Sequence, residues 1–163
     1  MKNGLTLCIL AVIVGVPIGA RPASGSAALQ YYVGSWSCTG GPIGQTPVKA
    51  AVTYTLDDGV MREWVTISPQ GKMKKPYVLS IATTYDAKNG RYVQDGVDSD
   101  AAWFVSFAKP WSGNTEQWAD HTTSSGKLGH GQTVRSQNSF VYTGYPSLTA
   151  TKPDFHVACQ RSS

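Results

Sequence analysis

Gly34-Ser35-Trp36-Ser37-Cys38 decides the fold, together with a second cysteine, Cys159, which lies four residues from the C-terminus. Residues 39–158 contain short segments in which polar and apolar residues alternate, with turn residues about every ten positions. This spacing is typical of an all-β barrel or sandwich. A disulfide between the first and the last strand would make the two ends of the sheet neighbours and so close it into a barrel.

The first residues are typical of a secretory signal peptide. An apolar run, residues 5–16, is followed by residues 17–28, which are rich in small side chains. The apolar run is shorter than the ~20 residues that a membrane-spanning helix needs. We predict that residues 1–27 direct export and are removed, with cleavage after Ala20 or Ala27.

Export would explain why the chain has three cysteines of which two can pair. Cys8 leaves with the signal peptide, and Cys38 and Cys159 remain as an even pair. The periplasm and the extracellular space are oxidising, so we expect these two cysteines to form a disulfide. Residues 28–163 suffice for one domain with one core, and we predict a single β-barrel domain there.

The charge of the chain is modest. The full sequence has a formal net charge of +4, and its basic residues are scattered apart from Lys72, Lys74 and Lys75 in a predicted turn. A nucleic-acid-binding surface needs a denser stripe of positive charge, so we expect no nucleic-acid partner. Nor is any later apolar stretch long enough for a membrane-spanning helix.

We predict a closed antiparallel up-and-down β-barrel of about ten strands, preceded by a short helix over residues 27–33. Ser26 or a neighbour can cap this helix, and Trp36 is expected to plug the adjacent end of the barrel. The strands are expected near residues 35–41, 48–56, 60–68, 77–85, 91–97, 101–108, 115–123, 127–135, 138–145 and 154–160.

Turn chemistry predicts the register of the first hairpin. A two-residue turn at Asp58-Gly59 leaves one face clearly more apolar than the other. The apolar face then pairs Ala50 with Ile67, Val52 with Val65 and Leu56 with Met61, and the other face pairs Thr53 with Trp64 and Thr55 with Arg62.

The second hairpin is decided by charge. A two-residue turn at Asn89-Gly90 would set Lys88 against Arg91, a pair of like charges. A four-residue loop that ends at Gly90 avoids this repulsion. It pairs Asp86 with Arg91 and Tyr85 with Tyr92.

The third hairpin is placed on a turn at Ser125-Gly126. This register pairs Glu116 with Arg135, Trp118 with Thr133 and His121 with His130. The ion pair supports the register, and Gly129 and Gly131 leave room for the indole ring of Trp118. A longer loop would shift every one of these pairs.

The stretch Gly34-x-Trp36, after a short helix, resembles the opening of calycin barrels, a group that includes lipocalins, fatty-acid-binding proteins and nitrobindin-like proteins. Residues 34–40 resemble more closely a set of small secreted bacterial proteins of unknown function. Those proteins begin Gly-x-Trp-x-Cys and end with a cysteine before a basic residue, as Cys159-Gln160-Arg161 does here. The resemblance implies a barrel with an internal cavity and leaves the ligand open.

The histidines are the candidate cofactor ligands. Nitrobindin-like barrels bind haem through a histidine near the C-terminus, and His156 is the corresponding candidate. Strand parity places His156 on the face opposite Trp36 and the disulfide, so no haem site is predicted. His121 and His130 would lie ~5 Å apart in the third hairpin. Zinc needs three or four ligands, so no metal site is predicted either.

The sequence carries no catalytic motif: no Gly-x-Ser-x-Gly, no His-Glu-x-x-His and no phosphate-binding loop. We therefore predict no catalytic residues. Glu63, which faces Tyr54 in the first hairpin, is either a buried acid or a rim residue beside Arg62.

These observations predict a secreted barrel that binds a small apolar or amphipathic molecule in its interior. The candidate wall residues are aromatic: Trp64, Trp103, Phe107, Phe140 and Tyr142. One alternative is an enzyme on the same barrel, such as an isomerase or a haem-dependent enzyme. Another is a cell-envelope interaction module with a solid core.

Overall fold

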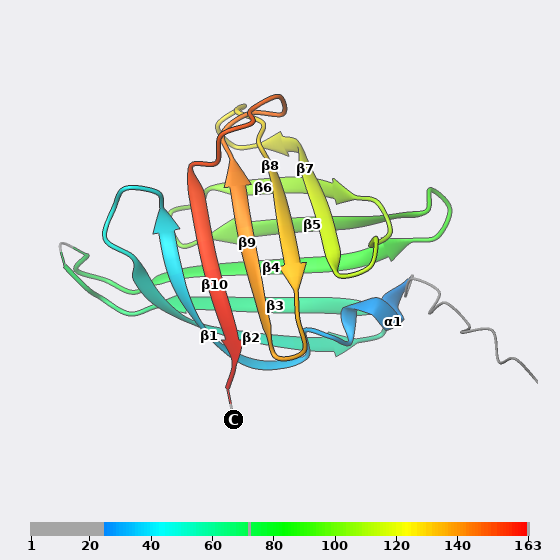
Figure 1. Ribbon diagram of the computed structural model, residues 1–163, viewed down its shortest axis with the longest axis horizontal. Helices are drawn as coiled ribbons and strands as arrows, with labels where there is room; N and C mark the ends of the chain where they lie inside the picture. The colour runs from blue at the N-terminus through cyan, green and yellow to red at the C-terminus, as the bar shows by residue number, and fades with distance from the viewer. Residues whose placement is uncertain (1–24, 72, 163) are drawn as a thin grey trace, which may run out of the picture.

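A computed structural model of the chain describes residues 25–71 and 73–162 and confirms the predicted all-β barrel (Figure 1). Ten antiparallel strands close on themselves in the order β1-β10-β9-β8-β7-β6-β5-β4-β3-β2. Their bounds are β1 Gly34–Pro42, β2 Val48–Asp57, β3 Val60–Ile67, β4 Tyr77–Asp86, β5 Arg91–Asp98, β6 Trp103–Ala108, β7 Thr115–Thr123, β8 His130–Arg135, β9 Ser139–Tyr145 and β10 Phe155–Arg161.

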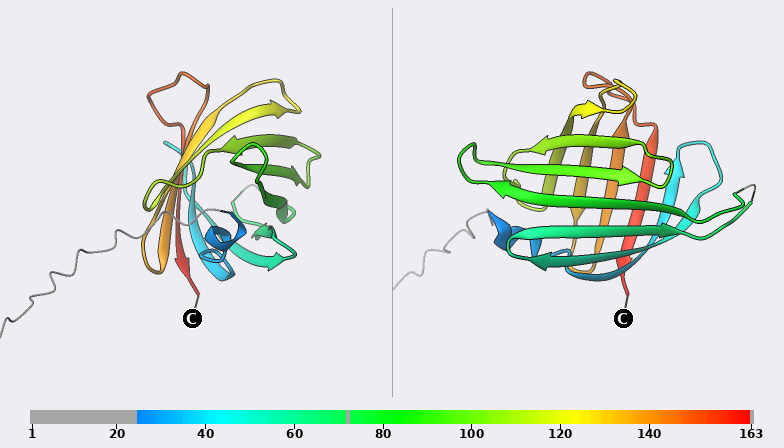
Figure 2. Two further views of the ribbon diagram at one scale, coloured as in Figure 1. Left: turned by 90° about the vertical axis from the view of Figure 1, so that its right-hand side faces the viewer. Right: turned by 180° about the vertical axis from the view of Figure 1, so that it is seen from behind.

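The barrel is flattened into two walls. Strands β2 to β6 form one wall and β7 to β10 the other, and the strands of the two walls cross at a steep angle (Figure 2). A short helix, α1 (Ser26–Leu29), lies at one end between the walls. Within the described part of the chain, no helix has the length and apolar character needed to cross a bilayer.

The helix is shorter than predicted. It ends at Leu29 and continues as turns rather than reaching residue 33. Gly25, the neighbour of Ser26, occupies the N-cap position, and no side chain caps the helix. Residues 1–24 of the predicted signal peptide lie outside the described residues.

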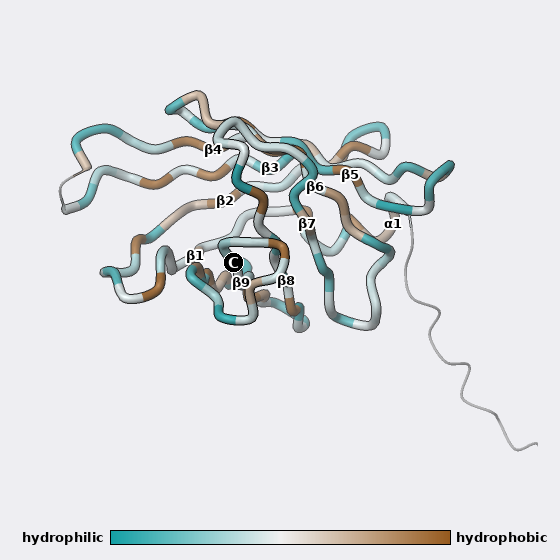
Figure 3. Tube along the Cα trace, turned by 90° about the horizontal axis from the view of Figure 1, so that it is seen from above, coloured by the Kyte–Doolittle hydropathy of each residue, from teal (hydrophilic) through white to brown (hydrophobic). Residues whose placement is uncertain are grey.

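The first two hairpins have the predicted registers. Val52 pairs with Val65 across β2 and β3, and Tyr85 pairs with Tyr92 across β4 and β5. Hydrophobic and hydrophilic residues alternate along β2 and β3 (Figure 3). Because side chains alternate between the two faces of a strand, this pattern gives each strand one inward and one outward face.

The third hairpin is shifted by two residues from its predicted register. Glu116 pairs with Thr133, and Trp118 pairs with Gly131. The connection between β7 and β8 is longer than the predicted two-residue turn. Two features accompany the longer connection. The pairing of β7 with β6 is irregular between Val105 and Ser106, and the Asp120 carboxylate accepts a hydrogen bond from the Gly129 amide at 2.8 Å. A shift of two residues keeps every side chain on its own face, so Trp118 is buried as predicted.

The seam of the barrel lies between β1 and β10. Cys38 pairs with Cys159 in the middle of this ladder, and the two form the predicted disulfide. At Gly40 strands β1 and β10 approach each other so closely that an added Cβ would overlap the backbone of His156 and Val157. The two ends of the chain are therefore joined both covalently and by close backbone packing.

Trp36 closes the helix-covered end, as predicted. The side chain is 1% exposed, and its Nε1 donates a hydrogen bond to the Tyr32 carbonyl at 2.6 Å. Its ring packs against Phe140 at 4.9 Å and lies under the Arg161 guanidinium at 4.3 Å. This cluster forms the base of the barrel.

Candidate functional site

The barrel encloses a cavity of about 860 Å³. It extends from the base, where Leu29, Tyr32 and Trp111 line it, to the loops at the other end, where Pro42 and Pro146 line it. Most of the wall between them is apolar and includes Val48, Ala50, Val52, Met61, Val65, Ile67, Leu79, Ile81, Phe104, Phe140 and Val157.

Two glycines shape the wall. An added Cβ on Gly96 would overlap the Phe104 ring, and one on Gly131 would overlap the Tyr142 ring. Each glycine thus makes room for an aromatic ring that lies over a neighbouring strand, and both rings line the cavity. The sequence prediction assigned the space at Gly131 to Trp118, but Tyr142 occupies it.

A buried carboxylate, Glu116, lies at the base of the cavity and is 3% exposed. It accepts hydrogen bonds from the Tyr32 hydroxyl at 2.5 Å and from Trp118 Nε1 at 3.4 Å. Arg135 Nε lies 3.2 Å from Glu116 Oε1, although its N–H is not aligned for a hydrogen bond, so this contact is an ion pair. The Arg135 guanidinium also stacks over the Trp111 ring at 3.9 Å.

Burial has the largest effect on the pKa of Glu116. It raises the pKa from an ordinary value near 4.5 to about 7, although the hydrogen bond from Tyr32 and the charge of Arg135 act in the opposite direction. The three partners hold the carboxylate in one place. Glu116 therefore belongs to the structural base of the barrel and is already fully engaged.

Glu63 on β3 is a second inward carboxylate. It faces Tyr54 across the hairpin, is half-buried and lines the cavity, so it lies inside the barrel rather than at its rim. Burial raises its pKa to about 7, and the negative charge of Glu116 adds to this, while a hydrogen bond with Tyr54 lowers it. Among the described residues no basic side chain forms an ion pair with Glu63, in contrast to Glu116.

Two further polar groups line the cavity. Asp120 accepts a hydrogen bond from Ser106 Oγ at 2.7 Å in addition to that from Gly129, so it is satisfied by the protein. Trp111 Nε1, in a side chain that is 3% exposed, has no acceptor within the described part of the chain. An unpaired buried donor costs free energy, and this nitrogen has almost no surface open to the cavity.

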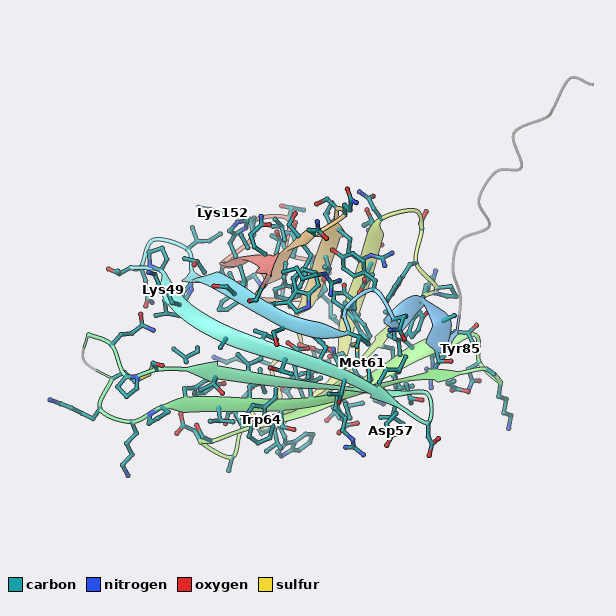
Figure 4. All side chains as sticks on the ribbon, turned by 90° about the horizontal axis from the view of Figure 1, so that it is seen from below. Lys49, Asp57, Met61, Trp64, Tyr85 and Lys152 are labelled. Carbon is teal, nitrogen blue, oxygen red and sulfur yellow. A yellow bond between two sulfur atoms is a disulfide. The ribbon has the colours of Figure 1, made fainter. Side chains whose placement is uncertain are left out.

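The aromatic wall residues predicted from the sequence divide into two groups. Phe140 and Tyr142 line the cavity. Trp64 and Trp103 are 55% and 45% exposed, and Trp64 projects away from the barrel (Figure 4). Phe107 also lies on the outer face, where its ring packs under the Arg91 guanidinium at 3.8 Å. The prediction was wrong for these three residues, because each lies on the outward parity of its strand.

Two of the outward aromatics, Trp64 and Trp103, belong to one row of residues on the outer surface. Across adjacent strands, Trp64 of β3 pairs with Ser80 of β4, Ser80 with Val97 of β5, and Val97 with Trp103 of β6. Val97 is 50% exposed. This surface is separate from the cavity, because it lies on the opposite face of the same strands.

The histidines are not brought together. His121 packs on Phe107 at 4.8 Å, whereas His130 pairs with Ala119 and stacks on Tyr145 at 4.3 Å. The predicted pairing of His121 with His130 is therefore wrong. Within residues 25–71 and 73–162, no three His, Cys, Asp or Glu side chains are grouped so that they could hold a metal ion. His156 is exposed on the face of β10 that points away from the cavity, so a haem inside the barrel would need another ligand.

No model of a known protein family matches the chain, and no curated protein matches it. The fold and the site thus define the class of protein by themselves. Over the described residues it is a closed ten-stranded antiparallel barrel with a large cavity, inward carboxylates that include Glu63, and a disulfide across its seam.

Proposed function

We propose that the barrel binds a small apolar or amphipathic molecule in its interior. The observation that carries this proposal is the cavity of about 860 Å³, which falls within the range of roughly 300–1,000 Å³ that ligand pockets occupy. Its walls are mainly aliphatic and aromatic, so binding would be driven by removal of the molecule's apolar surface from water. A few inward polar groups would fix its orientation.

The resemblance of Gly34-x-Trp36 to the opening of calycin barrels supports the same function. The resemblance implies a barrel with an internal cavity. The closed sheet, the short helix and the position of Trp36 are all compatible with this comparison.

We also propose that the protein is exported, and that cleavage after Ala20 is the better of the two predicted sites. The disulfide supports export, because such bonds persist in oxidising compartments. The Gly25 carbonyl accepts a hydrogen bond from the Tyr92 hydroxyl at 3.0 Å, and Ala27 lies within α1. Cleavage after Ala27 would remove both features. Mass spectrometry of the N-terminal peptide of exported protein would distinguish the two sites.

Binding of the neutral dye Nile red tests the main proposal. We expect its fluorescence to rise on addition of the protein, and a Val65→Trp substitution to weaken the rise by narrowing the cavity. The matched control is Thr66→Trp, which adds the same ring one residue along on the outer face of β3. An unchanged signal with Val65→Trp, in a variant with native circular dichroism, would refute interior binding.

The alternatives make different demands on the structure. An enzyme on this barrel would need an oriented base in the cavity. His121 and His156 are exposed, whereas His130 lines the cavity and its Nδ1 is held by the Ser147 carbonyl at 2.9 Å. An interaction module with a solid core is at odds with the cavity. The outer row of Trp64, Val97 and Trp103 still favours a surface contact. A Trp64→Ser/Trp103→Ser variant that retains Nile red binding would separate that surface from the cavity.

A further inference from the structure

We propose that the cavity selects molecules that carry a positively charged amine, and that the carboxylate of Glu63 is the counter-ion of that amine. This inference rests on the proposed function, because it names the chemical class of the molecule that the cavity would bind.

The lining carries more acidic than basic side chains. Glu63, Glu116 and Asp120 line the interior, and Asp154 lines the loop end. Among the described lining residues the one basic side chain is His130, which is stacked on Tyr145 and bonded to Ser147. A carboxylate-bearing molecule would therefore meet like charge without a free cation to receive it.

Of the three acids in the interior, Glu63 has the fewest partners from the protein. Glu116 has Arg135, Tyr32 and Trp118, and Asp120 has two hydrogen-bond donors. The partner of Glu63 is the Tyr54 hydroxyl, and its facing residue on β4, Ile81, is apolar. A carboxylate in apolar surroundings is unfavourable unless it is paired with an opposite charge. An ammonium group would supply that charge.

The groups that face Glu63 set the pH range of the effect. They are Tyr54 from β2, Glu116 from β7 and Tyr142 from β9, whereas β4 presents no ionisable side chain to it. None of these groups is cationic. Glu63 loses its proton near pH 7, so the cavity offers its full negative charge only above that pH.

The cavity also has room for the remainder of such a molecule. Met61 and Val65, two residues away on either side along β3, point into the same space as Glu63, as does Ile81. An alkyl or aryl group beside the amine would pack on these side chains.

Three probes with the same alkyl chain test the inference: decylamine, decanol and decanoate, each titrated against bound Nile red. At pH 8 we expect decylamine to bind at least tenfold more tightly than decanol, and decanoate to bind more weakly than decanol. Between pH 8 and pH 5.5 the affinity for decylamine should fall by about tenfold, to that of decanol, as Glu63 is protonated, while the affinity for decanol should not fall.

A Glu63→Gln substitution keeps the shape of the side chain and removes its charge. In this variant decylamine should bind no more tightly than decanol, and the pH dependence of decylamine binding should disappear. Arg62→Gln is the matched control, since Arg62 is the next residue on β3 and is exposed on the outer face. It should retain the preference for the amine.

Two results would overturn the inference. One is equal binding of decylamine and decanol to the unmodified protein at pH 8. The other is an amine preference that survives in a folded Glu63→Gln protein. If none of the probes and no Nile red bound, the proposed function itself would fail, and this outcome is distinct from binding without charge selection.

Discussion

Replacement of both Cys38 and Cys159 by alanine is the sharpest test of how the barrel is closed. The two residues are separated by 121 positions, so their bond closes a loop that contains nearly the whole described chain. In the chain-entropy model a loop of this length stabilises the folded state by about 5 kcal/mol. Single domains have total stabilities of about 5–15 kcal/mol, so the double variant should be close to unfolding.

Urea unfolding followed by tryptophan fluorescence would measure this loss as a difference in the free energy of unfolding. The matched control is a Ser37→Ala/Gln160→Ala variant, which alters the adjacent pair of the same ladder on its exposed face. That control should lose no more than about 0.5 kcal/mol per residue. A loss below about 1 kcal/mol in the cysteine variant would refute the view that the bond holds the two ends of the sheet together.

Further predictions concern charge and packing. The raised pKa values of Glu63 and Glu116 mean that the folded state holds protons that the unfolded state has released, so the free energy of unfolding should fall as the pH rises from about 4.5 to about 7. Urea titrations across that range would show this, and Glu63→Gln should flatten part of the slope. Gly40→Ala should cost about 3 kcal/mol, because the new methyl group meets the backbone of β10, whereas Thr39→Ala should cost much less. Arg135→Gln should raise the pKa of Glu116 further, as a carboxyl NMR titration would show, and should destabilise the barrel by about 3 kcal/mol.

Local turn chemistry explains which parts of the fold could be predicted. Asp58 and Gly59 both adopt positive φ in the first turn, and Gly90 does so in the second. These turns therefore fix the registers of their hairpins without contacts from distant residues. The connection between β7 and β8 depends instead on the hydrogen bond that the Gly129 amide donates to the Asp120 carboxylate, and on the irregular pairing of β7 with β6. Neither is visible in a local pattern, so the predicted register there was two residues off.

The candidate site was only partly predictable for a related reason. Aromatic character alone does not distinguish the inner from the outer face, which is why Trp64 was assigned to the wall. The signal that could have corrected this was present: the predicted register already placed Trp64 on the face opposite Val65. The same parity placed Glu63 inside. The roles of Glu116 and Trp111 depend on contacts between strands and loops that are distant in the sequence.

Native mass spectrometry of protein purified without detergent from its own host would test most directly whether the barrel is a container. We expect the unmodified protein to carry the extra mass of a small molecule, and the Val65→Trp protein to carry less of it. If both proteins showed the mass of the bare, disulfide-bonded polypeptide, the cavity would have no cargo and the proposed function would be contradicted.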